Sequence, residues 1–237
     1  MADPIFSSAP IRPGAPASAE AVADTLRRAV LAHRVAPGTK LSEDEVGSAL
    51  GVGRAIVREA LRALAHEHLV EIQRNRGAFV ARPDKREAVE IFEARSLLEP
   101  RTARSAAARA EYADVSDLRR HLAEENEAMG SGDSGRAVYL SGQFHVQIAR
   151  IANQVTIARF VESLVLRSSL IVALYWQRPS AICECHAHEA LVDAIAMGDG
   201  AGAEEIMHGH LVDLLSGLDL AERPREGVSL AMALKGL

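Results

Sequence analysis

The sequence predicts a mainly α-helical protein built in two parts. Its 237 residues are 48% hydrophobic but only 4% aromatic, and the abundant Ala and Leu favour helices over sheets. The stretch from Leu41 to Ala81 reads as two short helices, a tight turn and a small β-hairpin. From Lys85 onward the pattern is helical, with no strand alternation and no repeat. We therefore expect three helices and a hairpin, followed by an all-α bundle of about six helices.

The first part is expected to begin with an amphipathic helix over residues 19–33. The next helix is expected to open at Ser42, because Glu45 follows it at the spacing of a capping box. Glycines in the segment 51–53 then break the helix and turn the chain, and a further helix is expected over residues 54–66.

The helix expected over residues 54–66 has a packing face and a basic face. At about 100° per residue, Arg54, Arg58 and Arg62 fall within about 80° of one another, away from the apolar side chains. Such a helix fits the major groove of duplex DNA, where Arg reads guanine edges and also meets phosphates. Taken alone, the same face could equally be an ordinary solvated surface.

A basic hairpin follows this helix and changes the interpretation. Strands are expected at residues 69–72 and 78–80, on either side of a turn that contains Arg74, Arg76 and Gly77. A helix-turn-helix followed by a basic hairpin is a winged helix-turn-helix. The three residues of the turn therefore join the three arginines of the helix as DNA-binding candidates.

These segments resemble the GntR family of bacterial transcription regulators. The chain carries APG, LSEDEV, LGVGRAIVREALRAL, HLVEI and RNRGAFV, which follow the family pattern over about sixty residues. The chain departs from the pattern at Gly53, Ala55 and Ile56, where the family usually has Ser, Thr and Pro. The missing hydroxyls could have capped the helix or contacted phosphate.

Charge is distributed unevenly along the chain, whose formal net charge is −5. Residues 20–82 carry ten Lys and Arg against eight Asp and Glu, a net of +2. Residues 83–237 carry sixteen against twenty-three, a net of −7. A slightly basic front and an acidic rear are typical of a DNA-binding unit joined to a unit that does not contact DNA.

These patterns predict four segments. Residues 1–18, rich in Pro, Ser and Ala, are expected to be a disordered arm rather than a signal peptide. Residues 19–82 form the expected DNA-binding domain, 83–220 the helical domain, and 221–237 a weakly patterned tail. No apolar run approaches the roughly 18 residues of a membrane span. Because cysteines are also scarce, we expect a cytoplasmic protein.

The second part is expected to contain helices over residues 85–110, 114–129 (with Asp114 as the N-cap), 134–151, 156–176, 179–197 and 203–218. An all-helical domain of this kind after a GntR-type front resembles the FCD ligand-binding domain of the FadR subfamily. The matching segments are FEARSLLEP, FHVQIARIANQ, HEALVDAIAMGD and MHGHL. The resemblance spans nearly the whole chain from Ala19 to Leu218, and it implies an effector-binding and dimerisation domain.

Three histidines, His145, His188 and His210, fall on three different expected helices. Imidazoles that project inward from facing helices can share one divalent metal, although a helical His is more often an ordinary surface or core residue. The resemblance implies more, because many FCD domains bind a divalent metal through one Asp and three His. Ser141 occupies the position of that Asp, so the three imidazoles would hold zinc or nickel with positions open to water or an effector carboxylate.

Two further groups have competing interpretations. Cys183 and Cys185 belong to the segment CECHAH, whose thiols and imidazoles suit zinc, but helical residues two apart point to different sides, which favours two semi-buried thiols. Arg95 precedes Glu99 by one helical turn and could form an ordinary surface ion pair. The FCD resemblance implies instead an inward guanidinium that binds an organic acid.

Together these features predict a ligand-responsive transcriptional regulator. It would bind a palindromic DNA operator as a homodimer, act as a repressor by analogy with the family, and respond to a small carboxylate in its helical domain. The alternative is a metal-dependent, hydrolase-like enzyme in which the histidines activate water. No HExxH, nucleophile motif or Gly-rich phosphate loop supports it, and it leaves the winged unit unexplained. The large acidic helical domain disfavours a purely structural DNA-bridging protein.

Overall fold

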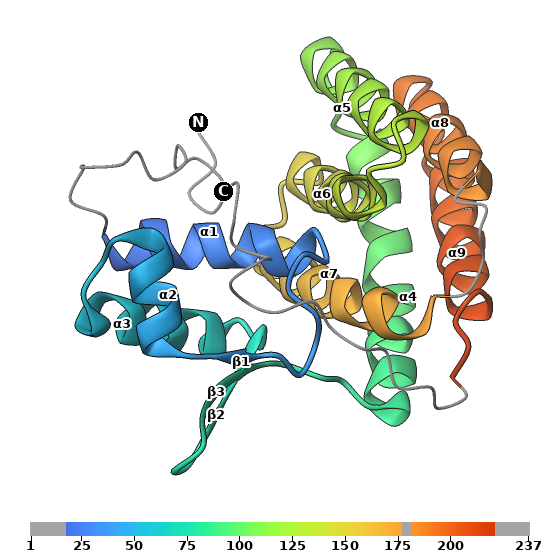
Figure 1. Ribbon diagram of the computed structural model, residues 1–237. Helices are drawn as coiled ribbons and strands as arrows, with labels where there is room; N and C mark the ends of the chain where they lie inside the picture. The colour runs from blue at the N-terminus through green and yellow to red at the C-terminus, as the bar shows by residue number, and fades with distance from the viewer. Residues whose placement is uncertain (1–17, 177–181, 221–237) are drawn as a thin grey trace. The chain divides into compact units, whose positions relative to one another are not determined.

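The computed structural model describes residues 18–176 and 182–220, and the side chains of residues 18–176 and 186–220. The chain divides between Arg82 and Pro83 into two compact units (Figure 1). The arm expected over residues 1–18, apart from Ser18, and the tail expected over residues 221–237 lie outside the described part.

The first unit consists of helices α1 (Ala19–Leu31), α2 (Glu43–Leu50) and α3 (Arg54–His66) with strands β1 (Lys40–Leu41), β2 (Val70–Gln73) and β3 (Gly77–Val80). Both α1 and α2 pack against α3. Apolar residues at helical spacing form the core, among them the fully buried Val22, Leu26, Val57 and Leu64. The apolar residues that recur at helical spacing therefore form the buried face of each helix.

The small sheet has three antiparallel strands in the order β1-β3-β2. Strands β2 and β3 form the predicted hairpin. The third strand, β1, was not predicted from the sequence. It pairs with β3, and Lys40 lies opposite Phe79 and Leu41 opposite Ala78. A two-residue strand is too short to show alternation.

The turn between α2 and α3 depends on Gly51, which ends α2 in the left-handed region with φ at 67°. A residue with a Cβ rarely adopts this conformation. At the other end of α2, Ser42 is the N-cap as predicted, and its hydroxyl accepts a hydrogen bond from the Glu45 amide.

The second unit consists of α4 (Lys85–Ala107), α5 (Tyr112–Gly130), α6 (Ser134–Ile151), α7 (Val155–Tyr175), α8 (Ile182–Ala196) and α9 (Gly200–Ser216). Helix α4 packs against α6, α7, α8 and α9 and lies among them in Figure 1. The predicted helices are present, and the start of α5 corrects one detail. Glu111, not Asp114, is the N-cap, because the Asp114 carboxylate reaches back to accept a hydrogen bond from the Glu111 amide at 2.9 Å.

Helix α7 holds the beginning of this unit in place. The Tyr175 hydroxyl donates a hydrogen bond to the carbonyl oxygen of Pro83 at 3.0 Å. One turn into α4, the Glu87 carboxylate pairs with Arg167 at 2.5 Å. Both contacts fix the first residues of the helical unit to the helix that forms a wall of the cavity described below.

No helix within residues 18–176 or 182–220 combines the length and apolar character that spanning a membrane would require.

Candidate metal centre and nucleic-acid interface

The basic face predicted for α3 is present and open to solvent. Arg54, Arg58 and Arg62 are exposed, whereas the opposite face of the same helix is buried in the core of the first unit through Val57, Ala60, Leu61 and Leu64. Gly53 precedes the helix as N-cap and offers no side-chain hydrogen bond. The departure from the family pattern at this position therefore leaves the helix start without a hydroxyl cap.

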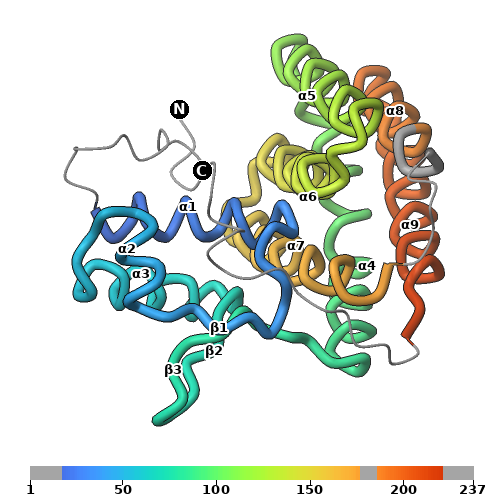
Figure 2. The backbone as a smooth tube through the Cα atoms, viewed as in Figure 1, coloured from blue at the N-terminus to red at the C-terminus, as the bar shows by residue number. Residues whose placement is uncertain are grey.

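The predicted basic turn joins β2 to β3. Arg74, Arg76 and Gly77 are exposed, and Figure 2 shows the hairpin extending beyond α2 and α3. The Arg76 guanidinium lies 5.5 Å from the centre of the Phe79 ring, a cation–π contact that orients this side chain. Gly77 has φ at 99°, which explains the glycine at this position.

A basic groove of about 360 Å³ runs between α3 and the hairpin. The cations that line it are Lys40, Arg58, Arg62 and Arg76. Lys40 was not among the predicted residues, and pairing of β1 with β3 brings it there. The only signal in the sequence was a basic residue directly before LSEDEV.

Two of the arginines on α3 already have acidic partners at the start of α2. Arg58 binds both carboxylate oxygens of Glu43, and Arg54 pairs with Asp44. The hydrogen bond from Arg58 lowers the pKa of Glu43. Two of the six DNA-binding candidates are therefore held by carboxylates, an arrangement the sequence analysis did not anticipate.

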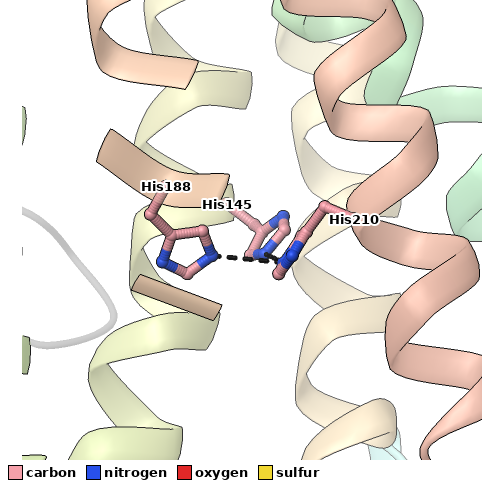
Figure 3. Close-up of side chains that lie close together, drawn as sticks. All are labelled: His145, His188 and His210. Atoms are coloured by element: carbon pink, nitrogen blue, oxygen red, sulfur yellow. Dashed lines mark hydrogen bonds between the residues drawn. The ribbon is translucent and has the colours of Figure 1, made fainter. Parts of the chain in front are cut away.

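The three predicted histidines meet inside the helical unit. His145 lies on α6, His188 on α8 and His210 on α9, and Figure 3 shows their rings converging. His210 Nε2 lies 3.2 Å from His188 Nε2 and 3.2 Å from His145 Nε2. All three residues are buried, with at most 4% of their surface exposed.

Burial keeps these imidazoles neutral. It lowers the pKa of His145 to about 4 and that of His188 to about 3, and it lowers the pKa of His210 well below the ordinary value. A neutral imidazole is the form that binds a metal, so the three rings need not lose a proton at neutral pH before they act as ligands.

Two buried carboxylates face the outer nitrogens of this cluster. Glu99 Oε2 lies 2.6 Å from His145 Nδ1, and Glu125 Oε2 lies 3.1 Å from His188 Nδ1. Burial would raise the pKa of Glu99, but Arg95 and His145 lower it to about 2. Burial raises the pKa of Glu125 to about 7. The sequence analysis assigned neither carboxylate to the site.

Arg95 combines features of its two interpretations. It does pair with Glu99, with Nε 2.5 Å from Oε1, but the pair is buried rather than on the surface. Its Nη1 also donates a hydrogen bond to the Ser168 hydroxyl at 3.0 Å. The guanidinium thus points inward, as the FCD resemblance implies, although Glu99 already binds two of its nitrogens.

A cavity of about 570 Å³ lies beside the histidine cluster. Its polar lining includes Arg95, Glu125, Ser141, His145, Ser168 and Ser169, and its apolar lining includes Val165, Val172 and Trp176. A space of this size, with a few polar groups in an apolar wall, is typical of a small-molecule site. Ser141, which the FCD resemblance places at the position of a metal-binding Asp, is one of the residues that line this cavity.

The CECHAH segment does not bring its two histidines together. The side chain of His186 is 79% exposed, whereas that of His188 is fully buried. The side chains of Cys183 and Cys185 lie outside the described residues. A site that uses both histidines is therefore not formed by this helix.

Comparison with known proteins connects both units to one family. A model of the "FCD domain" matches residues 90–213, and a model of "Bacterial regulatory proteins, gntR family" matches residues 18–80. The HTH-type transcriptional regulator LutR of Bacillus subtilis (strain 168) is 29% identical over 206 residues, covering 76% of this chain and 93% of that protein. The galactonate operon transcriptional repressor of Escherichia coli (strain K12) is 26% identical over 207 residues, covering 76% and 88%.

Solved structures show the same fold. A GntR transcriptional regulator from Rhodococcus sp. RHA1 superposes with a TM-score of 0.74 at 24% identity, covering 84% of this chain and 95% of that one. E. coli McbR/YncC gives the same TM-score at 20% identity and the same coverage. The relatives are transcription regulators and not enzymes. The chain therefore belongs to the GntR family of DNA-binding bacterial transcription regulators and carries an FCD domain after its winged helix-turn-helix.

Proposed function

We propose that this regulator is a homodimeric repressor that binds a palindromic operator and is controlled by a small carboxylate bound beside a divalent metal in its helical domain. The observation that carries the proposal is the meeting of three buried imidazole nitrogens next to a cavity that Arg95 also lines.

DNA binding is assigned to the exposed face of the first unit. The six residues predicted from the sequence are all exposed, and Arg58, Arg62 and Arg76 among them border one groove. Lys40 joins this set. In winged helix-turn-helix proteins a helix enters the major groove and the wing contacts the backbone, and a symmetric dimer reads two half-sites. Arg54, Arg58 and Arg62 are therefore assigned to the major groove, and Arg74, Arg76 and Gly77 to the flanking backbone.

The geometry of the histidines fits a metal. Metal–nitrogen bonds of about 2.1 Å at tetrahedral angles place neighbouring ligand atoms about 3.4 Å apart. Two of the three separations between Nε2 atoms are 3.2 Å, and the ligand atoms of the three histidines all lie within 4.8 Å of one another. Figure 3 shows the three rings directed at one another from different helices. His145, His188 and His210 are the residues that would hold zinc or nickel.

Proton positions also favour a cation in this place. Glu99, which Arg95 keeps ionised, faces Nδ1 of His145, so this ring carries its proton there and presents a lone pair at Nε2. His188 presents its Nε2 lone pair in the same way toward the ionised form of Glu125. His210 Nε2 faces both lone pairs and can donate at most one proton. Direct hydrogen bonds cannot satisfy all three nitrogens, and a shared cation does.

The cavity is assigned to the effector. A bound ion would supply a coordination position for a carboxylate oxygen. Arg95 adds positive charge to the wall, while the hydroxyls of Ser141, Ser168 and Ser169 offer hydrogen bonds and the valines bury an apolar chain. The guanidinium of Arg95 must share its donors with Glu99, so its contribution to binding is partly electrostatic.

Dimerisation is assigned to the helical unit. The adjacent helices α4 and α7 each leave a large apolar side chain in water, Leu97 at 79% exposure and Phe160 at 60%. Contiguous apolar patches on a surface mark interfaces, and these two side chains are the candidates that we assign to such a patch on the helical unit. A dimer formed here would present two copies of the DNA-binding unit to a two-fold symmetric operator.

Selection of bound sequences from a random DNA pool, followed by anisotropy titrations, tests the proposal. We expect a dyad-symmetric site, a protein-to-site ratio of two, and a change in affinity when one member of a panel of small carboxylates is added. His210→Ala should abolish the response to the carboxylate, and His208→Ala, at an exposed histidine of the same helix, should retain it. A site without symmetry, or a carboxylate response that survives His210→Ala, would contradict the assignment.

A further inference from the structure

Glu125 is a buried acid whose charge is not balanced by a cationic side chain. It lies on α5, is 2% exposed, and faces His188 Nδ1 with Oε2 at 3.1 Å. Within the described part of the chain no Lys or Arg pairs with it. It is also the one carboxylate among the described residues that line the cavity.

Glu99, the other carboxylate of the cluster, is in a different electrostatic position. The guanidinium of Arg95 donates hydrogen bonds to both oxygens of Glu99, at 2.5 and 3.3 Å, so the negative charge of Glu99 is balanced without a metal. A buried charge is costly unless an opposite charge accompanies it. The negative charge near His145 is therefore balanced within the protein, and the negative charge near His188 is not.

The donor set itself carries no charge. Three neutral imidazoles meet at the centre, and Ser141 contributes a hydroxyl to the cavity wall beside them. A divalent ion held by these nitrogens would enter a buried site with two positive charges. Glu125 is placed to offset one of them through His188, because a carboxylate on the outer nitrogen of a ligating histidine fixes its tautomer and raises its basicity.

We infer that Glu125 is the residue that supplies the negative charge of the metal centre and orients His188 toward it, although it is not itself a metal ligand. This inference rests on the proposed metal site. It assigns a role to a residue on α5, a helix that contributes none of the three imidazoles. One positive charge remains at the loaded centre, and it is available for a carboxylate effector.

A purely structural role makes a different prediction. If Glu125 served only to join α5 to α8 through His188, its loss would weaken the metal-free fold. If it serves the metal, the metal-free protein gains nothing from this negative charge, because burial already raises the pKa of Glu125, and the neutral isostere should fold at least as well. Glu125→Gln separates the two cases, since the amide oxygen still accepts the Nδ1 proton and only the charge is lost.

The test uses the full chain and the metal alone. Zn²⁺ and Ni²⁺ affinities are measured by competition with a chromophoric chelator for the wild type, Glu125→Gln, Glu124→Gln and His210→Ala, together with the melting temperature of each metal-free protein. Glu124 is an exposed neighbour on the same helix and provides the matched control. We expect Glu125→Gln to bind metal about 10- to 100-fold more weakly, with an unchanged or raised melting temperature. Glu124→Gln should match the wild type.

The outcomes separate this inference from the proposed function. Wild-type affinity in Glu125→Gln, with binding lost in His210→Ala, would overturn the role of Glu125 and leave the metal site standing. A lower melting temperature of metal-free Glu125→Gln would also overturn it, in favour of the structural role. Absence of metal binding in the wild type would remove the metal site and this inference together.

Discussion

Arg58 and Glu43 form a bidentate ion pair across the start of the DNA-binding face. Arg58 Nε lies 2.8 Å from Glu43 Oε1, and Nη2 lies 2.7 Å from Oε2. Arg58 is still 55% exposed, so the pair holds the guanidinium in one direction without covering it. Orienting an arginine before binding reduces the rotamer freedom it must lose on DNA.

Removing this arginine should weaken specific binding. Arg58→Ala is expected to lower operator affinity by about 1–3 kcal/mol and to relax base preference at one position of each half-site. Anisotropy titrations against the selected operator and a scrambled duplex measure both effects. Arg86→Ala is the control, because Arg86 is an exposed arginine in the helical unit that is also paired with a glutamate. Equal losses on both duplexes would mean that Arg58 contacts phosphate and not bases.

The Asp44 carboxylate should restrain binding to any DNA sequence. It pairs with Arg54, and both side chains are more than half exposed, so the carboxylate competes with phosphate for the guanidinium. Asp44→Asn is expected to raise non-specific affinity several-fold at low salt and to steepen the slope of log K against log salt by about one. Asp117→Asn removes a similarly exposed ion pair, with Arg120, from the helical unit and should change neither quantity. An unchanged slope would show that Arg54 does not reach the backbone.

A carboxylate at position 141 should strengthen the proposed metal site. Ser141 lines the cavity together with His145, one turn later on α6, so Ser141→Asp adds an anionic oxygen one helical turn from the first of the three histidines. We expect Zn²⁺ and Ni²⁺ affinity to rise at least about tenfold. Ser134→Asp places the same charge elsewhere on the cavity wall and should have little effect on metal affinity. Equal gains in the two variants would point to general electrostatics and not to coordination.

Metal should also stabilise the helical unit. Saturation at one hundred times the dissociation constant should add about 2.7 kcal/mol to the free energy of unfolding, and EDTA should reverse the gain. Thermal melts with and without Ni²⁺ measure it. His210→Ala should show no gain, whereas His208→Ala, at an exposed histidine of α9, should behave as the wild type. A gain that persists in His210→Ala would place the ion elsewhere.

Loss of the Arg95 guanidinium should destabilise the fold, because Glu99 would remain buried without its cation. Arg95→Ala is expected to lower the free energy of unfolding by about 3–5 kcal/mol, measured by urea denaturation. Replacing both partners with apolar residues, as in Arg95→Met with Glu99→Leu, should recover much of the loss. Arg101→Ala, at an exposed position of α4, is the control. A loss below about 1 kcal/mol would show that water reaches Glu99.

The predictions that succeeded rest on local patterns. Periodicity placed the arginines of α3 on an exposed face, and the GntR and FCD segments indicated the family that the comparisons then showed. The same segments pointed to His145, His188 and His210, which the fold brings together from three helices. Whether they bind metal stays a prediction.

What the sequence could not predict depends on contacts between distant segments. Glu125 and His188 are 63 residues apart, and no local spacing connects them. Lys40 reaches the basic groove only because β1 pairs with β3. The misplaced N-cap of α5 has a different, local cause, because the carboxylate of Asp114 can cap from inside the helix as well as from its edge.

The hydrogen bond from the Tyr175 hydroxyl to the carbonyl oxygen of Pro83 attaches the end of α7 to the first residue of the helical unit. Upstream of Tyr175, the same helix contributes Ser168, Ser169 and Val172 to the cavity wall. One helix therefore both lines the cavity and holds Pro83, so a ligand that displaced α7 would directly move the first residue of the helical unit.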